Sequence, residues 1–103
     1  MNIIDLIDAI KERPQFFLLS HSIYEFDAFL RGYHYYQFSH EIGKTDEDIA
    51  FEEFKTNWLM TRIGVKGKPS YIQCLMFESY NESEALEKFF IYWKEFTESL
   101  HKF

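Results

Sequence analysis

Apolar residues recur at three- and four-residue steps along most of the chain, which is the period of an amphipathic helix. The first run consists of Ile3, Leu6, Ile7 and Ile10. Asn2 stands before it and is a favourable helix cap. Pro14 disfavours helical geometry at the residue before it. The pattern therefore predicts a first helix that ends near Arg13.

The second run has the strongest helix signature in the chain. Ser22 and Glu25 have the spacing of an S-x-x-E capping box. The stripe that follows is Ile23, Phe26, Leu30, Tyr33 and Gln37. Gly43 is the expected helix stop. Gly32 inside the run costs about 1 kcal/mol relative to Ala, so we expect another helix to approach closely there.

A third helix is predicted from Thr45, a capping residue followed by three acids, to Arg62 or Ile63 before Gly64. Its apolar residues form two faces, with Phe51, Phe54 and Trp58 on one and Ile49, Leu59, Met60 and Ile63 on the other. A helix that is apolar on two sides is expected to pack against neighbours on both.

The segment 71–77 fits either a buried strand or two turns of buried helix. We favour the helix, because Ser70 can cap it and a lone strand would have no partner in the chain. Residues 65–69 before it read as a loop. The last helix restarts at Asn81, and its apolar stripe is Leu86, Phe89, Phe90, Trp93, Phe96 and Leu100.

These elements predict an all-α protein: a compact bundle of four to five helices, with residues 1–103 forming a single domain. The chain has 103 residues, of which 47% are hydrophobic and 20% are aromatic, and it contains only four Gly and two Pro. Such a chain can bury enough apolar surface to fold, and its length suits one core.

Charge narrows the classes of partner. Seventeen acidic residues against eleven basic ones give a formal net charge of −6, which disfavours nucleic acid and anionic membranes as partners.

No apolar run approaches the roughly 20 residues that span a bilayer. The first twelve residues carry three acids where a signal peptide is basic and apolar. Cys74 is the single cysteine, so no disulfide forms within the chain. We expect a soluble cytoplasmic protein.

The chain lacks the local motifs of common catalytic and metal sites. No serine stands in a G-x-S-x-G turn, and no phosphate-binding G-x-x-x-x-G-K motif is present. Helical di-iron sites need two Glu-x-x-His pairs, and only Glu98 and His101 have that spacing. His34 and His40 are six residues apart, which does not align them on a helix. We therefore assign no catalytic, cofactor-binding or metal-binding residue and expect a protein that is not an enzyme.

The distribution of charged and aromatic residues points to a binding surface. We predict a charged partner-binding region at Asp46, Asp48, Glu52 and Glu53, and a second acidic candidate at Glu84 and Glu87. Tyr24 and Tyr35 turn away from the apolar stripe of the second helix, and Ile91 lies among the glutamates of the last one. Exposed rings and aliphatic groups beside carboxylates are typical of protein interfaces.

Two stretches resemble a group of small bacterial immunity proteins from contact-dependent growth inhibition and related polymorphic toxin systems. The first runs from Ile10 and Arg13-Pro14 through Phe17-Leu18 to Ser22-Ile23-x-x-Phe26-x-x-Phe29-Leu30-x-Gly32-Tyr33. The second is Ala85-Leu86-x-x-Phe89-Phe90-x-x-Trp93-x-x-Phe96. Relatives commonly have an aromatic-Leu-Gly step after Arg-Pro, where this chain has Phe17-Leu18-Leu19 without the glycine.

The resemblance implies a cytosolic protein that binds and neutralises one cognate toxin domain, often a nuclease, without catalysing a reaction. It assigns no contact residues. A nuclease holds phosphates in a basic cleft, so an acidic protein can be steered to that cleft and occlude it.

Two other function classes stay open. The same surface would suit an acidic helical adaptor or regulator of a host protein, with no toxin involved. A small enzyme or ligand carrier would instead need an apolar pocket in which His34, Tyr36 and His40 converge.

Overall fold

The computed structural model describes residues 2–100. Its elements are α1 (Ile3–Glu12), η1 (Pro14–Phe16, a 3-10 turn), α2 (Ile23–Ser39), α3 (Asp46–Glu53), η2 (Phe54–Trp58, a π-helical turn), α4 (Leu59–Ile63), α5 (Tyr71–Phe77) and α6 (Glu82–Leu100). Because η2 joins α3 and α4 without a break, residues 2–100 form five helical rods and contain no strand. The prediction of an all-α bundle of four to five helices is confirmed.

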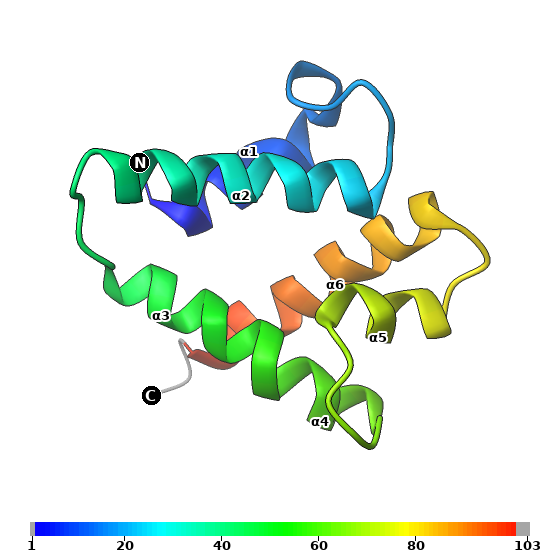
Figure 1. Ribbon diagram of the computed structural model, residues 1–103. Helices are drawn as coiled ribbons and strands as arrows, with labels where there is room; N and C mark the ends of the chain where they lie inside the picture. Colours follow the sequence, from blue (N-terminus) through cyan, green and yellow to red (C-terminus); the bar gives the residue numbers. More distant parts are fainter. Residues whose placement is uncertain (1, 101–103) are drawn as a thin grey trace.

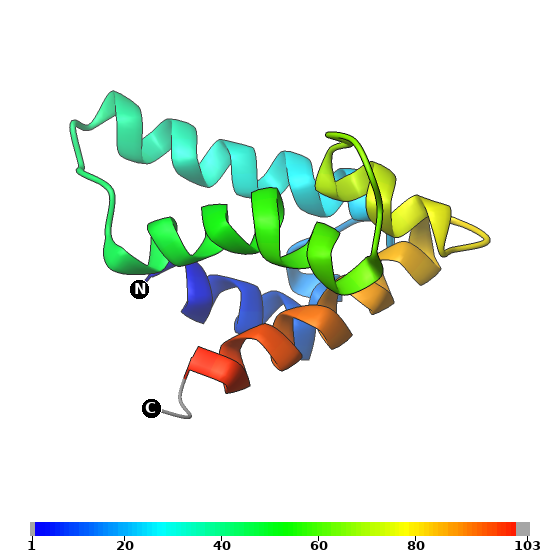
Figure 2. The same cartoon turned by 90° about the horizontal axis from the view of Figure 1, so that it is seen from below.

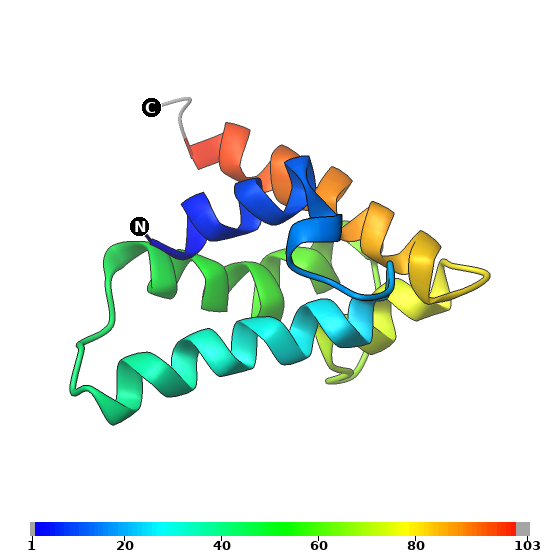
Figure 3. The same ribbon diagram turned by 90° about the horizontal axis from the view of Figure 1, so that it is seen from above.

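The helices are arranged in two groups around a shared core. Figure 1 shows α1 and α2 on one side and α3, α4 and α5 on the other. Helix α6 packs against α2, α5 and η2 and so connects the two groups. Figures 2 and 3 show that α2 ends and α3 begins at the same end of the molecule, where the loop 40–45 joins them.

The core is built from aromatic rings that meet on α6. The Phe54 ring contacts the rings of Phe89, Trp93 and Phe96 at centroid distances of 5.4, 5.0 and 5.3 Å. Phe26 of α2 contacts Phe89 from the opposite side at 4.7 Å. Most of these ring pairs are edge-to-face or tilted, which aromatic quadrupoles favour. The buried stripe predicted for the last helix is thus the centre of the fold, apart from Leu100, which is exposed.

Three predicted helix starts are confirmed by their side-chain caps. The Asn2 and Ser70 side chains accept the backbone N–H groups of Asp5 and Gln73, each within a reciprocal capping box. Asn81 Oδ1 accepts the N–H of Glu84 at 2.8 Å. Since Ser70 caps α5, the open choice for residues 71–77 is decided in favour of the helix.

The end of α2 differs from the prediction. The helix ends at Ser39, and Glu41 rather than Gly43 takes the left-handed conformation, with φ of 56°. The N–H of Ile42 donates to Gln37 O at 2.8 Å and that of Glu41 to Phe38 O at 3.1 Å. These are the bonds of a Schellman motif, which satisfy the last carbonyls of the helix four residues before the expected stop.

Two further expectations for α2 are wrong. Ser22 caps the helix, but the Glu25 carboxylate accepts hydrogen bonds from Leu19 N–H, Ser20 N–H and the Ser20 hydroxyl instead of closing a capping box. A Cβ added at Gly32 would meet nothing within 4 Å, so no helix approaches closely there.

The predicted third helix is continuous from Asp46 to Ile63 but contains the π turn. In this turn the N–H of Leu59 donates to Phe54 O, five residues back, so the turn takes one extra residue. The extra residue rotates Leu59 toward the face of Phe51 and Phe54, and all three side chains are buried. Leu59, which a regular helix would place on the second apolar face, therefore lies on the face of Phe51 and Phe54. Ile49, also predicted on the second face, is exposed.

We expect Phe54→Ala to destabilise the fold by about 3–5 kcal/mol, because it removes a fully buried ring and leaves a cavity among three others. Urea unfolding followed by circular dichroism measures the change. Phe77→Ala is the matched control, since the exposed Phe77 ring should contribute less than about 0.5 kcal/mol. Equal losses for the two variants would contradict the assignment of Phe54 to the core.

Candidate functional site

Three of the four acids predicted on the third helix are exposed: Asp46, Glu52 and Glu53. Glu52 Oε1 lies 3.3 Å from Lys55 Nζ. Glu53 accepts a hydrogen bond of 2.8 Å from Asn57 Nδ2. Both contacts are between neighbours on the surface of one helical run, where such pairs contribute only tenths of a kcal/mol. A partner can therefore reach all three carboxylates.

Asp48 is buried, with 4% of its surface exposed, although the sequence suggested a solvent-facing carboxylate. Thr45 N–H donates to Asp48 Oδ2 at 3.0 Å, and Gln37 Nε2 donates to the same oxygen at 3.4 Å. Asp48 Oδ1 lies 3.4 Å from His34 Nε2 and has no hydrogen-bond partner among residues 2–100. Asp48 therefore caps α3 and links it to α2.

Two opposing effects act on the pKa of Asp48. Burial raises the pKa, whereas hydrogen bonds from Thr45 and Gln37 and the nearby His34 ring lower it. The hydrogen bonds and the ring together prevail, so the pKa of Asp48 lies below its usual value. The side chain is consequently a carboxylate at neutral pH, and it places a negative charge inside the α2–α3 contact.

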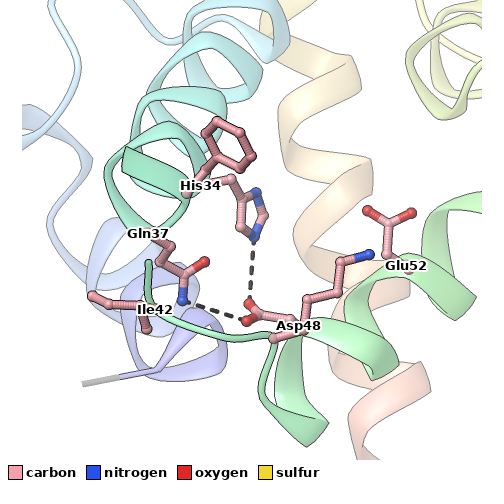
Figure 4. A pocket seen from close by; sticks show the side chains of 7 residues that line it. His34, Gln37, Ile42, Asp48 and Glu52 are labelled. Carbon is pink, nitrogen blue, oxygen red and sulfur yellow. Dashed lines mark hydrogen bonds and ion pairs between the residues drawn. The ribbon is translucent and has the colours of Figure 1, made fainter. Parts of the chain in front are cut away.

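A hollow of about 270 Å³ lies beside this contact, and we call it the α2–α3 hollow. It is lined by His34, Gln37 and Phe38 of α2, Ile42 and Lys44 of the loop, and Asp48 and Glu52 of α3. Figure 4 shows the His34 ring and the Gln37 amide pointing from α2 toward Asp48 on α3. The lining thus includes two apolar side chains, Phe38 and Ile42, and two acidic ones, Asp48 and Glu52.

The distal half of α2, residues 33–39, has no fully buried side chain, although Tyr33 packs against the core and His34 stacks on Phe51. The buried side chains of α2 end at Leu30. Beyond it the rings of Tyr35 and Phe38 are 71% and 80% exposed, and Ile42 in the following loop is 48% exposed. Large exposed apolar groups gathered on one helix end are an uncommon feature of a surface that contacts only water.

The predicted anchors Tyr24 and Tyr35 are both exposed on one face of α2, together with Arg31. They are eleven residues apart, or about 16 Å along the helix axis. Tyr35 is not among the residues that line the α2–α3 hollow. Tyr24 lies in a separate depression between α2 and α5, so the structure does not bring the two rings together.

The second acidic candidate lies on α6 at the opposite end of the molecule from the start of α3 (Figures 1 and 2). Glu84 Oε1 pairs with Lys88 Nζ at 3.3 Å, and Glu87 Oε1 lies 2.5 Å from His21 Nε2. Ile91 is exposed on the same helix. Both glutamates therefore have partners, as Glu52 and Glu53 of α3 do.

The residues weighed for an enzyme or carrier do not converge. His40 stacks on Tyr36 at a centroid distance of 4.0 Å, and its Nδ1 contacts Tyr36 O at 3.0 Å. His34 faces the α2–α3 hollow, which neither Tyr36 nor His40 lines. On a helix, residues 34 and 36 are about 200° apart.

Two further kinds of reactive group are the thiol of Cys74 and clusters of metal-binding side chains. Cys74 is buried, and burial raises the pKa of its thiol, which lowers its reactivity. Within residues 2–100, no group of three or more His, Cys, Asp or Glu residues is placed to hold a metal ion. His101 of the Glu98–His101 pair lies outside the described residues.

Sequence reasoning missed Phe38, Ile42 and Gln37 as members of the site. A signal was present for Phe38, which is about 120° around the helix from the buried Phe26 and so lies off the apolar stripe. No sequence signal marked Gln37, because its position on the stripe suggested packing. Its contact with Asp48 depends on how α3 is placed beside α2.

No family model, curated protein or solved structure matches this chain. Among residues 2–100, no helix combines the length and apolar character needed to cross a bilayer. The function proposed below is therefore inferred from the fold and the α2–α3 hollow.

We expect Asp48→Asn to reduce stability at neutral pH by on the order of 1 kcal/mol, because the charge that accepts three contacts is lost. The contribution is complete above the unfolded-state pKa, which is about 4, and disappears as the pH falls through the lower folded-state pKa. The gap in urea midpoint between wild type and variant should therefore close on acidification.

Asp46→Asn is the control, because Asp46 is at the same helix end but exposed. It should destabilise the fold less than Asp48→Asn does, because an exposed carboxylate gives up no buried hydrogen bond. A gap for Asp48→Asn that stays constant from neutral pH to about pH 2 would show that the charge of Asp48 has no stabilising role.

Proposed function

We propose that this chain is an immunity protein that binds and neutralises a cognate bacterial toxin domain. We propose that this toxin domain is a nuclease. The observation that supports it best is the composition of one surface. The exposed Phe38 ring of α2 and the exposed Glu52 carboxylate of α3 both line the α2–α3 hollow, and Tyr35, Asp46 and Glu53 are exposed on the same two helices.

Electrostatic attraction is the first part of the proposed mechanism. The formal net charge is −6, and Asp46, Glu52 and Glu53 contribute exposed negative charge to one helical run. A nuclease that holds phosphates presents positive charge around its cleft. Opposite potentials raise the rate of encounter and orient the two proteins.

Anchoring is the second part. Tyr35, Phe38 and Ile42 expose apolar surface beside the carboxylates. Aromatic side chains at the centre of an interface carry a large share of binding energy, and a charged rim excludes water around them. Since Tyr35 and Phe38 are largely exposed, their rings can enter a concave surface without disturbing the bundle.

Occlusion is the third part. Carboxylates placed where substrate phosphates bind would deny the substrate access, so inhibition needs no chemistry from this chain. The proposal therefore assigns it no catalytic residue and no cofactor. An immunity protein of this kind acts in the cytoplasm of the cell that makes the toxin, and we locate the chain there.

Co-expression with the polypeptide encoded immediately upstream tests the proposal. A stable complex that co-purifies, together with rescue of growth, is the expected result, because immunity genes directly follow their toxin genes. An intact upstream polypeptide that does not bind would contradict the immunity role and favour an acidic adaptor that uses the same surface on a host protein.

The combined change Asp46→Asn, Glu52→Gln and Glu53→Gln should slow association with the toxin domain by about tenfold or more at low salt, because it removes three charges from the steering surface. The variant should also show a weaker dependence of the rate on salt. Stopped-flow or biolayer measurements at several salt concentrations give both quantities.

The matched control is Asp8→Asn, Glu12→Gln and Glu98→Gln, three exposed acids on α1 and at the end of α6. It changes the net charge equally and should slow association far less. If the two triple variants behave alike, net charge alone governs encounter and the α3 surface has no special part.

A further inference from the structure

The α2–α3 hollow has the composition of a receptor for one basic side chain. Its volume of about 270 Å³ lies below the roughly 300–1,000 Å³ typical of small-molecule pockets. Its lining combines apolar side chains, Phe38 and Ile42, with acidic ones, Asp48 and Glu52, which matches a side chain with an aliphatic stem and a charged end. This inference rests on the proposed function and specifies how the partner is held.

Asp48 gives the strongest indication of a missing cation. Its side chain is 5% exposed, and Oδ1 has no hydrogen-bond partner among the described residues. His34 Nε2 is 3.4 Å from Oδ1, which is long for a charge-assisted bond. A buried carboxylate with incomplete pairing favours a positive charge in the adjoining space.

Glu52 supplies the acceptor that a guest can reach directly. Its side chain is 48% exposed and lines the hollow. Lys55, its ion-pair partner, is held on another side, because Lys55 Nζ lies over the rings of Phe51 and Tyr71 at 4.6 and 5.7 Å. Lys55 lines a different depression, next to Tyr71.

Lys44 is the one cationic side chain among the residues that line the hollow. It is exposed, and none of the ion pairs found in residues 2–100 includes it. A flexible, strongly hydrated ammonium on a loop is a weak occupant. A guest cation would compete with Lys44 for the same carboxylates.

We propose that the α2–α3 hollow binds an arginine side chain of the partner protein. The guanidinium pairs with the Glu52 carboxylate and offsets the charge of Asp48, while the stem packs against Phe38 and Ile42. Arginine suits this site better than lysine, because its planar guanidinium is less strongly hydrated, stacks on rings such as His34 and Phe38, and forms two parallel bonds to one carboxylate.

The first experiment uses N-acetyl-arginine amide as the probe, titrated into the labelled protein and followed by NMR. Saturable shifts should concentrate at His34, Phe38, Asp48 and Glu52, with a Kd on the order of 1–20 mM. Glu52→Gln should weaken binding about fivefold, and Lys44→Gln should strengthen it about twofold to threefold. Asp46→Asn, which removes an exposed charge outside the hollow, should change binding by less than about twofold.

Three results would overturn the proposal. They are shifts that spread over the acidic surface without saturation, equal losses for Glu52→Gln and Asp46→Asn, and weaker or unchanged binding after Lys44→Gln. N-acetyl-lysine amide is the comparison probe. If it binds as tightly as the arginine probe, the site is not selective for guanidinium and the assignment to arginine is wrong.

The second experiment separates this inference from the proposed function. In the complex with the upstream-encoded polypeptide, Phe38→Ala and Glu52→Gln should each raise the dissociation rate by about tenfold. Tyr80→Ala, which removes an equally accessible ring near the start of α6, should not. A complex that is insensitive to both hollow variants would refute the arginine site alone, whereas a probe that binds without any complex would refute the toxin partner alone.

Discussion

The fold depends on one aromatic cluster, in which Phe54 of η2 and Phe26 of α2 pack against the rings of α6. Phe54 contacts Phe89, Trp93 and Phe96, and Phe26 of α2 contacts Phe89 and Phe90. Rings of this size bury much apolar area per residue, so a chain of 103 residues can form a core from a few of them. Phe51 of α3 and Tyr71 of α5 join this cluster through the rings of Trp93 and Phe89.

That constraint also explains why a binding surface is available. The fully buried side chains of α2 end at Leu30, so Tyr35 and Phe38 in the last turns of the helix are exposed. The Schellman motif at Glu41 and Ile42 then turns the chain back toward α3. Asp48 fixes the start of α3 beside His34 and Gln37, and the space left between the two helices is the α2–α3 hollow.

Local sequence signals predicted the helices whose limits are set by nearby residues. Asn2, Ser70 and Asn81 cap their helices as expected, and Gly64 ends the third helical run with φ of 83°. The stop of α2 was placed at Gly43 because glycine is the usual residue for a left-handed turn. Glu41 adopts that conformation instead, a choice that the sequence preference alone does not predict.

The candidate site was less predictable, because its main features depend on contacts between helices. Asp46 and Asp48 look alike in a run of acids, yet only Asp48 is buried, because it faces α2. The π turn rotated Leu59 into the core and changed which residues of the third helical run are exposed. Helical periodicity identified exposed rings such as Tyr35, but it could not pair Phe38 and Ile42 with Glu52 across the hollow.

Amide hydrogen exchange of the free protein and of its complex with the upstream-encoded polypeptide tests the central claim most directly. The account predicts that protection on binding appears in residues 33–53, where α2 leaves the core and α3 begins, and that α5 and the first half of α6 are unchanged. Protection confined to α5 and α6, with residues 33–53 exchanging as in the free protein, would contradict it.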